Sequence, residues 1–109
     1  MANPYRGEVA IVIEGQTRIM RLTLGSLAEL ETRLGSDSLS EMIRRFETGD
    51  FRVRDLICLI TAGLNGGGWK VSEEELLKLN IEGGPVAVAR AAAHLLKITF
   101  TLPGEGDVE

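Results

Sequence analysis

The segment from Pro85 to Phe100 most constrains the fold, because it reads as a helix that is apolar on nearly every side. Its sequence is PVAVARAAAHLLKITF. Its ionisable side chains, Arg90, His94 and Lys97, recur at helical spacing and form one narrow polar stripe. A surface helix of a small domain usually has one apolar face and a broad polar one. This helix is therefore either the central packing helix or a surface offered to a partner.

Length and composition indicate one globular domain with an aliphatic core. The chain has 109 residues, of which 44% are hydrophobic, 26% charged and only 5% aromatic. A chain of this length is expected to form a single domain. We expect that domain to span residues 1–102, followed by a flexible acidic tail over residues 103–109. The net charge of -4 argues against a nucleic-acid-binding surface, which requires concentrated basic charge.

The single cysteine and the short apolar runs predict the compartment. Cys58 has no second cysteine with which to form an intramolecular disulfide, and this suits a reducing environment. The sequence shows no secretory signal pattern and no apolar run long enough to cross a bilayer. We therefore expect a cytoplasmic protein that does not bind membranes.

Glu8–Glu14 and Thr17–Leu24 are expected to form an antiparallel hairpin. Gly15-Gln16 would be its two-residue turn, because glycine at the first loop position favours a type II′ turn. This register places Val12 opposite Ile19 on the outer face of the hairpin. On the apolar inner face it pairs Val9 with Leu22 and Ile11 with Met20. A two-stranded sheet is marginally stable alone, so the inner face needs helices to cover it.

Apolar periodicity and capping residues predict five helices after the hairpin. They span residues 24–34, 39–48 after a Ser38–Glu41 capping box, about 53–64, from Ser72 to near residue 80, and 85–100. The inner stripes of the first and third helices begin at Leu24 and Val53. Arg52 is a poor N-cap, so we expect the start of the third helix to fray. The sequence therefore predicts an α+β fold, in which an N-terminal antiparallel β-hairpin packs against four to five α-helices.

No group of side chains has the spacing of a catalytic or metal-binding site. His94 and Cys58 are the only histidine and cysteine, whereas a zinc site needs three or four ligands and a catalytic base needs an orienting acid. Glu73, Glu74 and Glu75 point about 100° apart on a helix, which is typical of capping charges rather than of an acid–base pair. We therefore expect no enzymatic activity, no cofactor and no metal.

The glycine run at residues 66–68 does not match a phosphate-binding loop. A P-loop has the pattern GxxxxGKS or GxxxxGKT between a strand and a helix, whereas Trp69 follows this run and a predicted helix precedes it. We expect a flexible loop between helices. Trp69 is either a lid over the core or an aromatic anchor for a partner.

Two surfaces are candidates for binding partners. The outer face of the hairpin, with Val12 and Ile19, would support self-association. The polar stripe of Arg90, His94 and Lys97, together with Trp69, would contact a client protein. The alternative is that these are ordinary surface residues without a binding role.

Five segments together resemble one known protein family. They are NPYRGEVAIVIEG, RLTLGSLAELETRLG, RFETGDF, DLICLITAGLNGGG and IEGGPVAVARAAAHLL. These segments are similar to the small tail proteins encoded in gene transfer agent clusters, which are phage-derived particles that package host DNA. That family is grouped with phage tail assembly chaperones and has also been labelled phage tail tube protein. The resemblance covers about residues 3–100, and its motifs are structural.

The resemblance implies a non-enzymatic role in building a phage-like tail. A tail assembly chaperone keeps the long helical tape-measure protein soluble until tube subunits polymerise around it, which requires an exposed apolar surface and no chemistry. One alternative is a structural tail tube or tail-completion subunit of the particle. Two further alternatives are a small enzyme or ligand-binding domain, which the missing catalytic spacing argues against, and a regulatory adaptor unrelated to tails. The expected partners are the tape-measure protein, other tail proteins and a second copy of the chain, but neither nucleic acid nor membrane.

Overall fold

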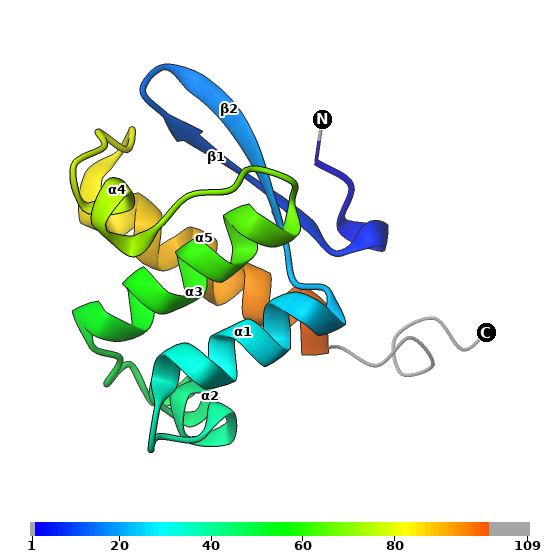
Figure 1. The fold of residues 1–109 in the computed structure, drawn as a ribbon, viewed down its shortest axis with the longest axis vertical. Coiled ribbons are helices and arrows are strands. Elements are labelled where there is room, and N and C mark those ends of the chain that lie inside the picture. The colour runs from blue at the N-terminus through cyan, green and yellow to red at the C-terminus, as the bar shows by residue number, and fades with distance from the viewer. Residues whose placement is uncertain (1, 101–109) are drawn as a thin grey trace.

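The computed structural model describes residues 2–100 and has the predicted α+β fold, a hairpin followed by five α-helices (Figure 1). After a short 3-10 helix (η1) the elements are β1 (Glu8–Ile13), β2 (Gln16–Arg21), α1 (Leu24–Leu34), α2 (Leu39–Thr48), α3 (Val53–Gly66), α4 (Glu73–Leu77) and α5 (Gly84–Phe100). The predicted acidic tail at residues 103–109 lies outside the described residues.

The hairpin turns one position earlier than predicted. Its turn is Glu14-Gly15, and both residues have positive φ angles, 53° and 78°, as the type I′ turns that suit hairpins require. The predicted type II′ turn at Gly15-Gln16 is therefore wrong. The segment that leads into α5 accounts for the difference, because Asn80 exchanges hydrogen bonds with Glu14. The backbone N–H of Glu14 donates to the Asn80 carbonyl, and the Asn80 N–H donates to the Glu14 carboxylate, each at 2.8 Å.

The register of the strands is shifted by two residues from the predicted one. Val9 pairs with Met20 rather than with Leu22, and Ile11 pairs with Arg18. A shift of two keeps every side chain on its predicted face, because side chains alternate with a period of two. The inner face is therefore buried as predicted, and its buried residues are Val9, Ile11, Ile13, Met20 and Leu22.

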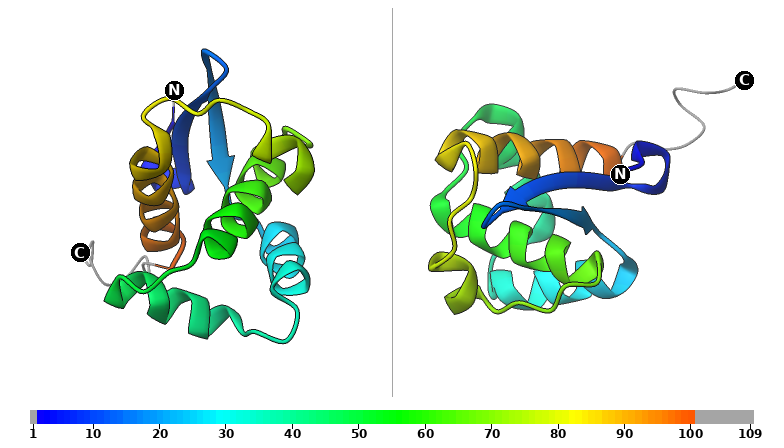
Figure 2. Two further views of the ribbon diagram at one scale, coloured as in Figure 1. Left: turned by 90° about the vertical axis from the view of Figure 1, so that its left-hand side faces the viewer. Right: turned by 90° about the horizontal axis from the view of Figure 1, so that it is seen from above.

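The hairpin packs on two long helices. β1 lies along α5 and β2 lies along α3, and these two helices also contact each other (Figure 2). α1 and α4 pack against α3, while α2 lies at the end of the molecule opposite the hairpin turn. The largest fully buried apolar side chains come from the hairpin and from every helix except α4. They include Met20, Leu30, Met42, Leu59, Ile60, Leu64 and Leu95.

Two residues placed in the predicted inner stripes are exposed instead. Leu24 is 86% exposed and Val53 is 72% exposed. Each is the first residue of its helix, α1 or α3. A stripe drawn from periodicity continues to the end of a helix, whereas the neighbouring elements that cover it stop earlier. The predictions for Leu24 and Val53 were therefore wrong.

We expect Leu30→Ala to lower the free energy of unfolding by about 3 kcal/mol, because Leu30 is fully buried and truncation leaves a cavity. Leu24→Ala changes the same side chain on the same helix and should cost less than about 0.5 kcal/mol. Chemical denaturation of both variants checks this. Equal losses would show that burial does not determine the cost on α1.

The glycine run ends α3 and packs against β2, so the predicted flexible loop is wrong for Gly66 and Gly67. α3 continues to Gly66, and Gly67 caps it. A Cβ atom on Gly66 would lie 2.0 Å from the carbonyl oxygen of Arg21, and one on Gly67 would lie 1.8 Å from that of Ile19. Helix and strand approach each other this closely only because neither glycine has a side chain.

Candidate partner-binding surfaces

A buried carboxylate joins α2 to the start of α3. Asp55 is fully buried, and its two oxygens accept hydrogen bonds from the Nε and Nη2 atoms of Arg45 at 2.8 and 2.7 Å. The backbone N–H of Arg52 also donates to Asp55, at 2.8 Å. Asp55, in the first turn, thus makes the half of a capping box in which the side chain of the third helical residue accepts from the N-cap backbone. The Asp55 N–H itself donates to the Arg52 carbonyl at 2.9 Å. This end of α3 is therefore hydrogen-bonded, and the expectation that it would fray is not supported.

The charges around Asp55 compensate one another. Burial alone would raise the pKa of Asp55, but the hydrogen bonds from Arg45 and Arg52 outweigh it and lower the pKa to about 2. The pKa of Asp37 is also lowered, above all by a hydrogen bond from Arg45, which lies 2.8 Å away. The cluster is ion-paired at neutral pH and has the properties of a structural link rather than of an acid–base centre.

A second ionic cluster joins α1, α3 and α4. Glu73 accepts from Arg33 at 2.8 Å and from Arg54 at 2.7 Å, and Arg33 also binds Glu29. Glu29 in turn accepts from Asn65 at 2.8 Å. Glu73 is therefore an interhelical ion-pair partner rather than only a capping charge. Ser72 and Glu75 form a capping box at the start of α4.

Cys58 is a packing residue in α3. Its side chain is fully buried, and the Sγ atom lies 3.9 Å from a Glu73 carboxylate oxygen. Burial raises the pKa of the thiol, which disfavours the reactive thiolate. Within residues 2–100 no group of three or more histidine, cysteine or acidic residues is placed to hold a metal ion. None of the described helices combines the length and the apolarity needed to span a bilayer.

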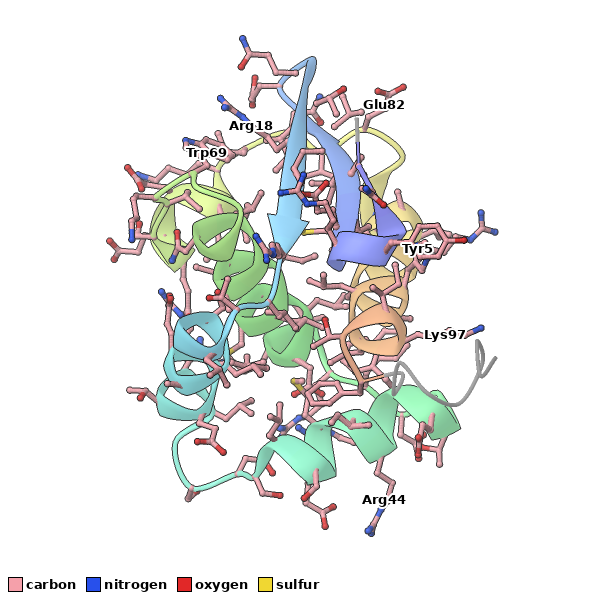
Figure 3. The ribbon with its side chains drawn as sticks, turned by 90° about the vertical axis from the view of Figure 1, so that its right-hand side faces the viewer. Tyr5, Arg18, Arg44, Trp69, Glu82 and Lys97 are labelled. Atoms are coloured by element: carbon pink, nitrogen blue, oxygen red, sulfur yellow. The ribbon has the colours of Figure 1, made fainter. Side chains whose placement is uncertain are left out.

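Trp69 lies over the core rather than standing free. It is half-buried, packs against the core cluster, and carries Arg18 on one face, with the guanidinium carbon 4.0 Å from the ring centroid (Figure 3). This geometry is that of a cation–π contact. It favours the lid interpretation of Trp69. The sequence did not reveal Arg18, although its position on the inner face of the hairpin was a signal that it meets the helices.

The polar stripe is exposed on α5, as predicted. Arg90, His94 and Lys97 are all exposed. Figure 3 shows Lys97 at the opposite side of the view from Arg18 and Trp69. The structure therefore does not bring Trp69 together with the polar stripe in one client-binding surface.

The outer face of the hairpin is only partly apolar. Val12 and Ile19 are half-buried, but they are not opposite each other, because Val12 pairs with Thr17 and Ile19 with Ala10. The predicted Val12–Ile19 pair is thus wrong. The hairpin edges are also partly covered. The backbone N–H of Glu82 donates to the Val12 carbonyl at 3.0 Å, and the glycine run lies against β2. Self-association through this face stays a prediction.

An apolar groove lies between α3, α4 and the start of α5, and we call it the α3–α4–α5 groove. Its volume is about 400 Å³. Val53 and Leu77, at its rim, are 72% and 65% exposed. This groove was not predicted, although Leu76 and Leu77 in α4 and Leu79 just after it are more apolar side chains than one buried stripe needs. The residues that line it include Val53, Leu56, Leu77, Pro85 and Val88.

A second groove, the α2–α5 groove, lies between α2 and the end of α5. Its volume is about 350 Å³, and its apolar lining comprises Ile43, Phe46, Ala93, Leu96 and Phe100. Glu47 and Lys97 are the charged residues in the lining. Helix α5 therefore borders both grooves, one near each of its ends, and its polar stripe reaches the α2–α5 groove at Lys97.

Comparison with known proteins identifies the family of this chain. Residues 6–101 match the family model described as "Phage tail tube protein, GTA-gp10". Neither the curated protein sequences nor the solved structures gave a significant match. Because the family match spans nearly the whole chain, as the resemblance predicted, this protein belongs to the GTA-gp10 family of phage tail tube proteins.

Proposed function

We propose that this protein is a tail assembly chaperone, which binds an apolar helical segment of the tape-measure protein and keeps it soluble until the tail tube forms. The α3–α4–α5 groove is the observation that carries this proposal. We further propose that the protein acts without enzymatic chemistry and in the cytoplasm, where tails are assembled.

The groove has the properties that a helical client requires. Val53 and Leu77 expose most of their side chains at its rim, and Leu56, Pro85 and Val88 contribute to its lining. An amphipathic helix binds by placing apolar side chains at spacings of three and four residues into such a groove. The described residues also contain only one two-stranded sheet. That architecture fits a helix-binding chaperone better than a tube subunit, which is usually rich in β-structure.

Co-expression of the tape-measure protein with this protein tests the proposal. The wild type should keep the tape-measure protein in the soluble fraction and co-purify with it. Leu77→Asp should reduce the co-purified amount about tenfold or more, because a buried carboxylate would face the apolar client. Leu24→Asp is the matched control, since Leu24 is also an exposed leucine, 86% exposed against 65% for Leu77, and does not line the groove. This variant should bind like the wild type. Failure of the wild type to bind would overturn the chaperone proposal.

A structural role in the finished tail is the second candidate, and the description of the matched family as a tail tube protein favours it. Mass spectrometry of purified particles separates the two roles. A chaperone should be absent or present far below one copy per tube subunit. Stoichiometric incorporation would instead establish a tube or tail-completion subunit.

A further inference from the structure

Helix α5 exposes a regular seam along its whole length. Val86, Arg90, Ala93, Lys97 and Phe100 are spaced by four, three, four and three residues and are all exposed. This is the spacing by which one helix presents a continuous face to another helix. The small side chain of Ala93 at the middle of the seam permits a close approach. The exposed face of α5 is thus shaped to receive a second helix.

The seam also carries charge of one sign. Helix α5 contains Arg90, Lys97 and His94 but no aspartate or glutamate, whereas the whole chain has 16 acidic and 12 basic residues. His94 lies one turn beyond Arg90 and borders the seam. Across the seam, the neighbouring charged residue from α2 is Glu47, which lines the α2–α5 groove together with Lys97. The exposed face of α5 is therefore basic, whereas the chain as a whole carries a net negative charge of -4.

We infer that the exposed seam of α5 binds an acidic amphipathic helix of a partner protein. Apolar side chains of that helix contact Val86, Ala93 and Phe100, and its aspartates or glutamates lie beside Arg90 and Lys97. The apolar side of the partner extends over Phe46 into the α2–α5 groove, which Ala93 and Phe100 also line. Charge complementarity selects the partner, and the apolar contacts retain it. The inference rests on the proposed function only for the identity of the natural partner, a tail protein.

Two synthetic helical peptides test this inference with the full-length protein. Both carry the same leucine and alanine heptad pattern, and the positions flanking the apolar stripe are glutamate in one peptide and lysine in the other. In calorimetric titration the glutamate peptide should bind, and the lysine peptide should bind about tenfold more weakly or not at all. The affinity for the glutamate peptide should fall as salt concentration rises, because exposed ion pairs are screened.

Charge reversal on the protein locates the site. Arg90→Glu should weaken the glutamate peptide about tenfold and improve the lysine peptide. Arg44→Glu is the matched control, because Arg44 is exposed on α2 (Figure 3) and the net charge changes equally. It should leave both affinities within about twofold. Circular dichroism of each variant checks that the helices remain folded.

The outcomes separate this inference from the proposed function. Three outcomes would overturn the inference that the seam binds an acidic helix. They are equal binding of the two peptides, no binding of either, and equal effects of Arg90→Glu and Arg44→Glu. A wild type that binds the tape-measure protein while the seam fails this test would leave the chaperone role intact. Conversely, glutamate-peptide binding lost in Arg90→Glu would support the seam even if the tape-measure protein does not bind.

Discussion

Gly67→Ala should destabilise the protein by about 4 kcal/mol, although helix propensity alone would favour alanine at this position by up to about 1 kcal/mol. Gly67 has an ordinary right-handed backbone, with φ -84° and ψ -1°. The added Cβ atom, however, would lie 1.8 Å from the carbonyl oxygen of Ile19. Backbone atoms cannot rotate away as a side chain can, so the end of α3 must separate from β2. Costs of this size are exceptional for one methyl group and indicate a forced backbone shift.

Gly25→Ala is the matched control for this prediction. Gly25 is the second residue of α1 and is exposed, as Gly67 is, and its added Cβ would lie 3.7 Å from the Thr23 hydroxyl oxygen. This substitution should be neutral or stabilise the fold by a few tenths of a kcal/mol, about as much as propensity allows. Urea denaturation of both variants gives the comparison. A Gly67→Ala variant as stable as Gly25→Ala would contradict the close packing of α3 on β2.

Asp55→Asn should lower the free energy of unfolding by about 3 kcal/mol or more. The substitution keeps the shape of the side chain but removes the charge that binds the Nε and Nη2 atoms of Arg45. The partly buried Arg45 cation is then left with Asp37 as its carboxylate partner. Removing one partner of a buried ion pair costs about 3–5 kcal/mol. Glu41→Gln is the control, because Glu41 pairs with Arg44 across 3.6 Å on the exposed side of α2. Its loss should cost less than about 1 kcal/mol. Similar losses in both variants would show that the Asp55 pair is not buried in solution.

The same carboxylate predicts how stability depends on pH. The pKa of Asp55 is lowered from 3.8 to about 2 in the folded protein. A depressed carboxyl pKa contributes stability above the unfolded value, and the contribution is lost as pH falls from about 4 to about 2. The expected loss is about 2 kcal/mol. Thermal melts across this range should show a smaller pH dependence for Asp55→Asn than for the wild type. An equal slope would contradict the folded pKa of Asp55.

Local signals in the sequence were sufficient to predict that the helices form and where each begins. Ser38 and Ser72 cap α2 and α4, and Gly35 and Gly49 follow the helices α1 and α2 that they end. These signals act within one turn, so they are readable without knowing the rest of the fold. The faces of the hairpin were also predictable, because they depend only on alternation. The hydrogen bond from the Arg52 backbone N–H to the Asp55 carboxylate was not predicted, because the prediction considered only the side chain at the N-cap position.

Contacts between distant segments decided the remaining features. The turn at Glu14-Gly15 depends on hydrogen bonds to Asn80, and the strict need for Gly67 depends on where the Ile19 carbonyl lies. Trp69 acquired its cation–π partner from the hairpin, which separated it from the polar stripe with which sequence reasoning had grouped it. In each of these contacts, the residues around one partner give no indication of which distant residue the other partner is.

The predicted ends of α3 and α4, near residues 64 and 80, differ from the observed ends at Gly66 and Leu77. The amino-acid sequence by itself determined the α+β class, the start of each helix to within one residue, the buried face of the hairpin and the exposure of Arg90, His94 and Lys97. All of these follow from periodicity and capping, which are properties of neighbouring residues. Only the tertiary structure decided the strand register, the ionic clusters and the apolar grooves on either side of α5. A groove exists where the surfaces of separate elements leave space between them, and that space depends on how the elements pack rather than on the sequence of any one of them.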